Sequence, residues 1–193
     1  MGASLDHTFV PNRSPNFDDD QGDEIYYGME IHNENGNQKV YPIPSTSELA
    51  RHLLRCLFDP QDIERAYVLF EPNHYVVLMI NNLGDLSNLE LLSFASVVNE
   101  QIQEDYDINP LRVYVGTFMT SLSGKGASIT VLNISKTILG DEKVLKLLDK
   151  PVSAPVWSMS IDWKCKGVVI AKEQDCQTKW QSSGLKASGS IHF

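Results

Sequence analysis

Apolar residues recur every three to four positions in three stretches of the chain, which predicts three helices. A Ser-x-x-Glu capping box opens the first helix at Ser45 and the second at Ser87, and Asp141 is the predicted N-cap of the third. The first helix ends before Asp59-Pro60, and the second runs to about Asp105. The predicted buried faces are Leu49, Leu53, Cys56 and Leu57, then Leu91, Phe94, Ala95, Val98 and Ile102, then Val144, Leu147 and Leu148.

Apolar runs rich in β-branched and aromatic residues predict strands at 25–32, 66–70, 75–80, 112–117 and 128–134. Turn residues separate the second run from the third and the fourth from the fifth, so each of these pairs is predicted to form a hairpin. Hairpins that alternate with helical crossovers favour an α+β (α/β-type) fold, a mixed β-sheet with helices packed on it, over a doubly wound parallel sheet.

The apolar pattern weakens after Trp157, and residues 177–190 are polar and rich in serine and glycine. The sequence therefore predicts one domain over residues 1–157, followed by a loose tail at 158–193. A chain of 193 residues fits one such domain.

Charge and hydropathy exclude some classes of function. The chain has 25 acidic and 16 basic side chains, a net charge of −9, which gives no general support to binding of nucleic acid. No apolar run reaches the roughly 18 residues that a membrane span needs, and the N-terminus has no signal-peptide pattern. We therefore expect no membrane partner and a cytoplasmic protein. The three widely spaced cysteines are expected to be reduced thiols.

Candidate chemistry is sparse when residues are considered one by one. The Gly124-Lys125 pair lacks the flanking residues of a phosphate-binding loop, and the five histidines show no metal-ligand spacing. His52 and His74 are interpreted as surface residues. His32 has the position of a site residue, at a strand end beside a glycine-containing turn, yet position alone favours an ordinary histidine there.

The stretch 28–36, Gly-Met-Glu-Ile-His-Asn-Glu-Asn-Gly, resembles the Gly-x-Gly-Ile-His-x-Glu-Pro-Gly motif of the dihydroxyacetone kinase family. That motif belongs to the substrate-binding (DhaK) domain. Further segments agree with the family in order and spacing, at 2–11, 81–90, 116–122, 128–132 and 145–157. The chain is therefore identified as similar to the second half of this domain in fungal members. It departs from the family where Glu30 and Asp85 replace glycines and Asn35 replaces a proline.

The resemblance implies a specific role for His32. In this family the motif histidine attacks the ketone carbon of dihydroxyacetone (glycerone) and holds the substrate as a covalent hemiaminal. A neutral imidazole nitrogen can add to a carbonyl, and the tethered triose then presents its hydroxyl in a fixed position. Phosphate from ATP completes the family's reaction, a kinase step of glycerol metabolism.

The resemblance also implies what this chain lacks. The family's first half supplies a glycine-rich segment, an aspartate and a histidine, and a separate helical domain binds ATP and magnesium. We therefore expect no cofactor bound by this chain, and a small triose ketone as its ligand. The protein partner is either the missing kinase half or a second copy, because the absent half would leave an apolar face exposed. Whether the chain is an enzyme part, a non-catalytic regulatory module or an inactive truncated product stays open.

Overall fold

The computed structural model describes residues 1–5, 23–28, 38–62, 65, 67–122, 124–154 and 157, and the predicted tail at 158–193 lies outside this part. No helix among these residues is long and apolar enough to cross a membrane. The helices are α1 (Thr46–Phe58), α2 (Asn88–Tyr106) and α3 (Asp141–Leu148), with a short 3-10 helix at Ile134–Lys136. The strands are β1 (Gly2–Ser4), β2 (Ile25–Tyr27), β3 (Gln38–Val40), β4 (Tyr75–Asn82), β5 (Asn109–Gly116) and β6 (Gly126–Asn133).

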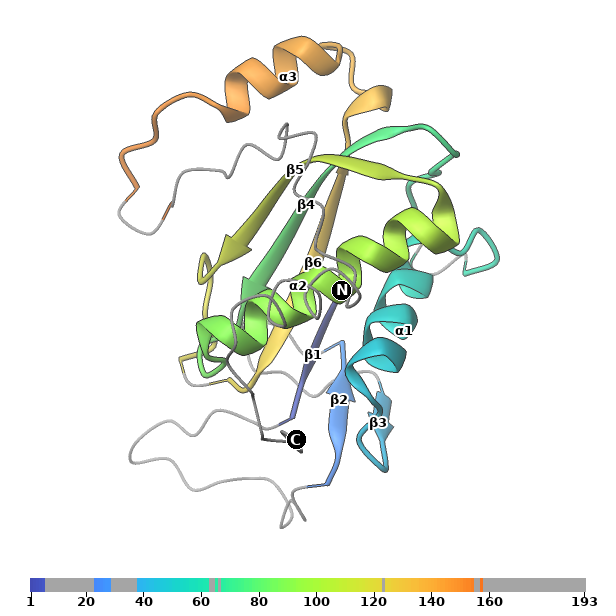
Figure 1. Cartoon of the computed structure of the whole chain (residues 1–193), viewed down its shortest axis with the longest axis vertical. Helices are drawn as coiled ribbons and strands as arrows, with labels where there is room; N and C mark the ends of the chain where they lie inside the picture. The colour runs from blue at the N-terminus through green and yellow to red at the C-terminus, as the bar shows by residue number, and fades with distance from the viewer. Residues whose placement is uncertain are drawn as a thin grey trace, which may run out of the picture. The chain divides into compact units, whose positions relative to one another are not determined.

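The six strands form one mixed sheet in the order β3-β2-β1-β6-β4-β5 (Figure 1). β4 and β5 are parallel, joined by α2 as the crossover, and all other neighbours are antiparallel. This arrangement confirms the predicted α+β class with a mixed sheet.

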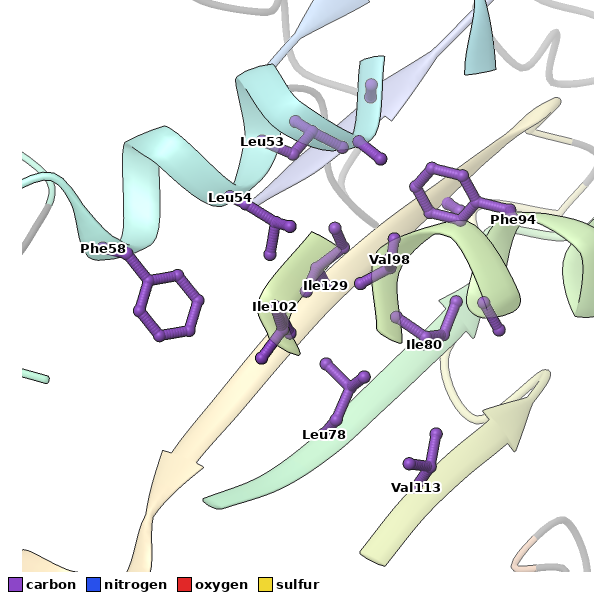
Figure 2. Packing of buried hydrophobic residues seen from close by; sticks show 14 of the residues in the cluster. Leu53, Leu54, Phe58, Leu78, Ile80, Phe94, Val98, Ile102, Val113 and Ile129 are labelled. Carbon is purple, nitrogen blue, oxygen red and sulfur yellow. The ribbon is translucent and has the colours of Figure 1, made fainter. Parts of the chain in front are cut away.

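The main core lies between the sheet and the two long helices. Leu53 and Leu54 of α1, Val98 and Ile102 of α2, and Ile80 of β4 are fully buried, and Figure 2 shows these side chains converging. The predicted buried face of α2 is confirmed at all of its positions: Leu91, Phe94, Ala95, Val98 and Ile102. The burial of this apolar face stabilises the packing of α2 on the sheet.

A second, smaller apolar cluster forms on the opposite face of the sheet. Side chains alternate between the faces of a strand, so Val77 points away from the main core while Val76 and Leu78 point into it. Val77 and Tyr114 pack there with Val144 of α3. α1 and α2 thus cover one face, and α3 covers part of the other.

Both predicted hairpins are wrong. Residues 67–70 form no strand, although their composition suits one, and β4 lies between β5 and β6 instead of beside a strand at 66–70. Strand β2 ends at Tyr27 within the described residues, and the three-residue strands β1 and β3 had no sequence signal. Pairing of strands distant in sequence, which local patterns do not encode, decides the order here.

The start and buried side of α3 also differ from the prediction. Gly140 is the N-cap and Asp141 is the first helical residue. The Asp141 carboxylate accepts a hydrogen bond from the Glu142 amide at 2.9 Å. Val144 is buried as predicted, whereas Leu147 is exposed, because a short helix at the margin of the sheet buries a narrow stripe.

Candidate functional site

The candidate site lies at the sheet edge where the parallel strands β4 and β5 end. Ligands of open sheets commonly bind outside the carboxyl ends of parallel strands. Ser4 pairs with Gly126 and Asn82 pairs with Ala127, so the end of β1 and the start of β6 lie at this same edge. The edge therefore collects segments 2–5, 81–87, 116–122 and 124–126, and the first three of these belong to the family resemblance.

Asn81, the buried second-last residue of β4, fixes the loop after β5. Its Oδ1 atom accepts hydrogen bonds from the amides of Phe118 and Met119 at 2.9 and 3.0 Å. Its Nδ2 atom donates to the Met119 carbonyl at 2.8 Å. One side chain thus satisfies three backbone groups that have no strand partner, which holds this loop in a single conformation.

Asn82, also buried, fixes the loop that leads into α2. Its Oδ1 atom accepts hydrogen bonds from the amides of Gly84 at 2.8 Å and Leu86 at 3.2 Å, and its Nδ2 atom donates to the Leu86 carbonyl at 2.7 Å. The two adjacent asparagines therefore hold the two loops of the edge from opposite faces of one strand.

Gly84 is required where these loops meet. Its φ is +146°, and a Cβ atom at this position would overlap the Leu122 carbonyl oxygen. Asp85, which replaces a family glycine, is exposed and outside the positive-φ region, and its amide donates to the Gly124 carbonyl at 3.1 Å. The carboxylate at Asp85 therefore costs the loop no backbone strain.

A cavity of about 230 Å³ opens beside this edge, between the N-terminal ends of α1 and α2. Its wall is largely apolar and includes Leu5, Leu49 and Phe94, with Lys125 and Glu90 among its polar residues. Hydrogen bonds from the Ser87 side chain and amide, followed by the charge of Lys125, lower the pKa of Glu90. The capping box therefore keeps this carboxylate ionised and engaged with the helix start, so it is not a free acid or base.

His32, Glu30 and Asn35 lie outside the described residues, but the strands that flank them are described. Gly28 has a φ of +81°, and its amide donates to the Gly2 carbonyl at 2.9 Å. The first glycine of the motif thus has the backbone conformation for which glycine is favoured. Tyr27 of β2 pairs with Gln38 of β3, so segment 29–37 connects two paired strand ends.

The structure corrects the interpretation of His52 as a surface residue. Its half-buried ring stacks on Tyr27, with centroids 4.1 Å apart, and its Nε2 atom lies 3.8 Å from the Cys56 Sγ atom. Burial is the main cause that lowers the pKa of His52 and raises the pKa of Cys56. Both groups are therefore neutral, so this pair is not an activated thiolate. The four-residue spacing on a predicted helix was a signal for this contact.

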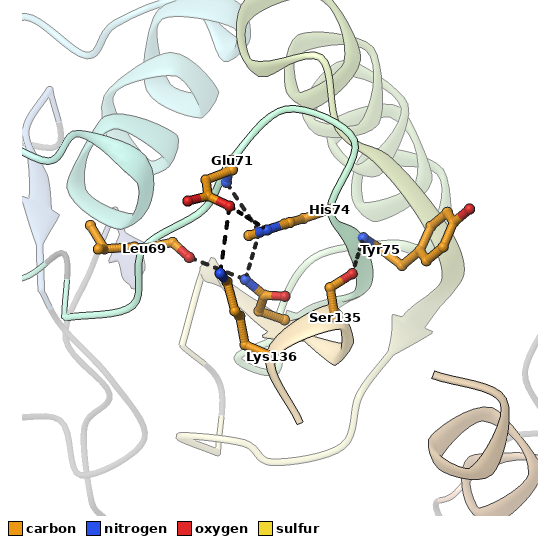
Figure 3. A network of polar contacts seen from close by, with 7 residues as sticks. Leu69, Glu71, His74, Tyr75, Ser135 and Lys136 are labelled. Carbon is orange, nitrogen blue, oxygen red and sulfur yellow. Dashed lines mark hydrogen bonds and ion pairs between the residues drawn. The ribbon is translucent and has the colours of Figure 1, made fainter. Parts of the chain in front are cut away.

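His74 is likewise not a surface residue, because its side chain is 12% exposed and takes part in a polar network (Figure 3). The Glu71 amide donates to His74 Nδ1 at 3.1 Å, and Asn133 Nδ2 lies at the same distance from that atom. The proton of the ring is therefore on Nε2, 2.9 Å from the Glu71 carboxylate. This network ties the segment before β4 to the end of β6, far from the candidate site.

The described residues form a fold of the α+β class, a mixed sheet with a loop-bearing edge and an adjacent cavity. Residues 1–156 match the model of the Dak1 domain, so the chain belongs to the Dak1 domain family, that of the dihydroxyacetone kinases. The resemblance inferred from the motif at 28–36 is thereby confirmed.

Relatives and solved structures agree with this assignment. A dihydroxyacetone kinase of Komagataella pastoris is 46% identical over 175 residues, covering 84% of this chain and 28% of the relative. A triokinase/FMN cyclase of Rattus norvegicus is 34% identical over 157 residues, covering 81% of this chain and 25% of the relative. This chain thus spans little more than a quarter of the length of these relatives.

Two solved structures share the fold. The dihydroxyacetone kinase of C. freundii, in complex with AMP-PNP and Mg²⁺, has a TM-score of 0.63 and 17% identity over 83% of this chain and 27% of its own. A dihydroxyacetone kinase operon co-activator has a TM-score of 0.61 and 24% identity over 78% of this chain and 42% of its own. At these identities the likeness shows the fold.

Proposed function

We propose that this chain binds dihydroxyacetone and holds it covalently on His32. The observation that carries the proposal is the motif at 28–36 within a Dak1 domain match that spans residues 1–156. The positive φ of Gly28 and the loops fixed by Asn81 and Asn82 support it, because both belong to segments that resemble the family.

The proposed step is an addition in which all atoms are retained. A lone pair on an imidazole nitrogen of His32 attacks the ketone carbon, the carbon–nitrogen bond forms, and the carbonyl π bond breaks. The carbonyl oxygen takes up a proton, and the other ring nitrogen releases one, so the adduct is a neutral hemiaminal. The triose is then held with its terminal hydroxyl in a restricted position, which lowers the entropic cost of a later transfer.

We propose that phosphoryl transfer to the bound triose needs residues beyond those of this chain. Among the described residues no group of three or more His, Cys, Asp or Glu side chains could hold a metal ion. We propose as partner either a chain that supplies the other part of a dihydroxyacetone kinase or a second copy of this chain. The cytoplasm is the proposed compartment.

Intact mass spectrometry under non-denaturing conditions tests the covalent anchor. With dihydroxyacetone, the chain should gain the full mass of the triose, because a hemiaminal forms without loss of water. His32→Asn should abolish this gain, and the control His192→Asn should retain it. Equal adducts on the wild-type chain and His32→Asn, or an adduct that has lost water, would contradict the proposal. Kinase turnover by this chain alone would contradict the assignment of transfer to other residues.

A further inference from the structure

A larger cavity, about 630 Å³, lies at the end of the molecule opposite the candidate site. It is lined by the C-terminal ends of α1 and α2 and by the segment 68–72. The smaller cavity beside the candidate site is lined by the N-terminal ends of these same two helices. Because α1 and α2 separate the two cavities along their lengths, the larger one belongs to neither the His32 motif nor the loops held by Asn81 and Asn82.

Three aromatic residues, Phe58, Phe70 and Tyr106, line this cavity and pack against one another. The Phe58 ring lies 4.5 Å from the Phe70 ring and 4.7 Å from the Tyr106 ring, centroid to centroid, and the Tyr106 pair is stacked. Val68 and Leu69 also line the cavity and are 49% and 65% exposed. Such a surface favours a ligand with a flat apolar body.

The residues that line the cavity carry a negative net charge. The lining carries five carboxylates and one guanidinium, that of Arg55: the acids are Asp59, Glu71, Glu104, Asp105 and Asp107. Both helices also direct their C-terminal ends, where the backbone dipole is negative, at the cavity.

Neighbouring cations compensate this charge only in part. Arg55 lies 3.9 Å from Asp59, Arg51 lies 3.3 Å from Asp105, and Lys136 lies 3.5 Å from Glu71. Glu104 and Asp107 make no ion pair within the described part of the chain. Burial is the main cause that raises the pKa of Tyr106; the charge of Asp105 adds to this shift, and the charge of Arg55 opposes it.

We propose that this cavity is a binding site for an organic cation, a flat apolar body that carries one ammonium or amidinium group. The body stacks against Tyr106 and Phe70, and the cationic group lies towards Glu104 and Asp107. An amidinium in this position gains charge-assisted hydrogen bonds to the two carboxylates. Binding involves no covalent step, and it is independent of the triose site.

Benzamidinium chloride, with neutral benzamide as the matched control ligand, provides the test. Isothermal titration calorimetry at low ionic strength should show benzamidinium binding about tenfold or more tightly than benzamide, and added salt should weaken it. Saturation-transfer NMR should show contact of the benzamidinium ring protons with the protein.

One double charge variant and one ring variant locate the site, and a charge variant on α3 is the control. Asp107 has a φ of +53°, which asparagine also tolerates, so Asp107→Asn removes the charge and keeps the helix end. Combined with Glu104→Gln, it should weaken benzamidinium binding about fivefold or more and leave benzamide unchanged. Tyr106→Leu should weaken both ligands, and Glu142→Gln on α3 should weaken neither. Equal binding of the two ligands, no binding of benzamidinium at millimolar concentration, or equal losses in the charge pair and Glu142→Gln would overturn the proposal.

Discussion

The backbone conformation of single residues at the carboxyl edge of β4 determines how closely the loop after β4 can approach the loop after β5. Gly84 illustrates this at a position where the loop after β4 passes the carbonyl of Leu122. Gly140 provides a comparison, because it also has a positive φ, +75°, but a Cβ atom added there would have no other atom within 4 Å. Of these two glycines, Gly84 alone combines a positive φ with a steric overlap.

Gly84→Ala is expected to destabilise the chain by about 2 kcal/mol or more, because the strained φ and the overlap with Leu122 add together. Gly140→Ala should cost about 1 kcal/mol, because its φ is positive and alanine is a poorer N-cap than glycine, without any steric overlap. Urea unfolding of both variants checks this difference. Equal losses would show that the loop at Gly84 moves away at no cost, which would contradict a rigid loop.

His52 gives a prediction for the pH dependence of stability. Burial lowers its pKa below the ordinary 6.5, so the unfolded chain takes up the proton first as the pH falls. The stabilising effect of neutral His52 is therefore complete above pH 6.5 and decreases as the pH falls from there towards the lowered pKa. His52→Gln should show a smaller loss of unfolding free energy than the wild-type chain between about pH 7 and pH 5. Identical slopes would exclude this role.

At the scale of elements, the two long helices begin with complete capping boxes. The Ser45 Oγ atom accepts a hydrogen bond from the Glu48 amide at 3.3 Å, and the Glu48 carboxylate accepts one from the Ser45 amide at 2.9 Å. Ser87 and Glu90 repeat this pattern at α2. Each box satisfies two amides that the helix start would otherwise leave without a partner.

Ser87→Ala is expected to lower the free energy of unfolding by about 1 kcal/mol, since α2 loses its cap. Ser96→Ala is the matched control, because Ser96 is inside the same helix, where alanine has the higher helix propensity. Chemical unfolding measures both. A loss at Ser96→Ala as large as that at Ser87→Ala would rule out the cap as the cause.

The helices were predictable because their signals are local. Capping boxes and apolar spacing lie within a few residues, and they place α1 and α2 correctly. Strand order was not predictable in the same way, since β4 pairs with β6 across about fifty residues and residues 67–70 stay unpaired despite their composition. At the site, the resemblance marked the segment with Asn81 and Asn82, but only their contacts in space show that they hold two loops.

At the scale of the whole molecule, α1 and α2 extend from one candidate binding site to another, and the two sites differ in charge and in size. Their N-terminal ends adjoin the candidate triose site at the carboxyl edge of β4 and β5, and their C-terminal ends adjoin the acidic aromatic cavity. We therefore propose one end as the site for a small neutral ketone and the other as the site for an organic cation. Membership of the Dak1 domain family supports the first assignment, and the second depends on the cavity alone.

The most direct test of the central claim, a triose held on His32, is the NMR signal of dihydroxyacetone labelled with ¹³C at its ketone carbon. Bound to the chain, this carbon should move from the carbonyl region to the region of a tetrahedral carbon attached to nitrogen and oxygen. If His32 is also labelled with ¹⁵N, the carbon should show coupling to a ring nitrogen, and His32→Asn should restore the carbonyl signal. A bound triose whose ketone carbon keeps its carbonyl shift would contradict the claim.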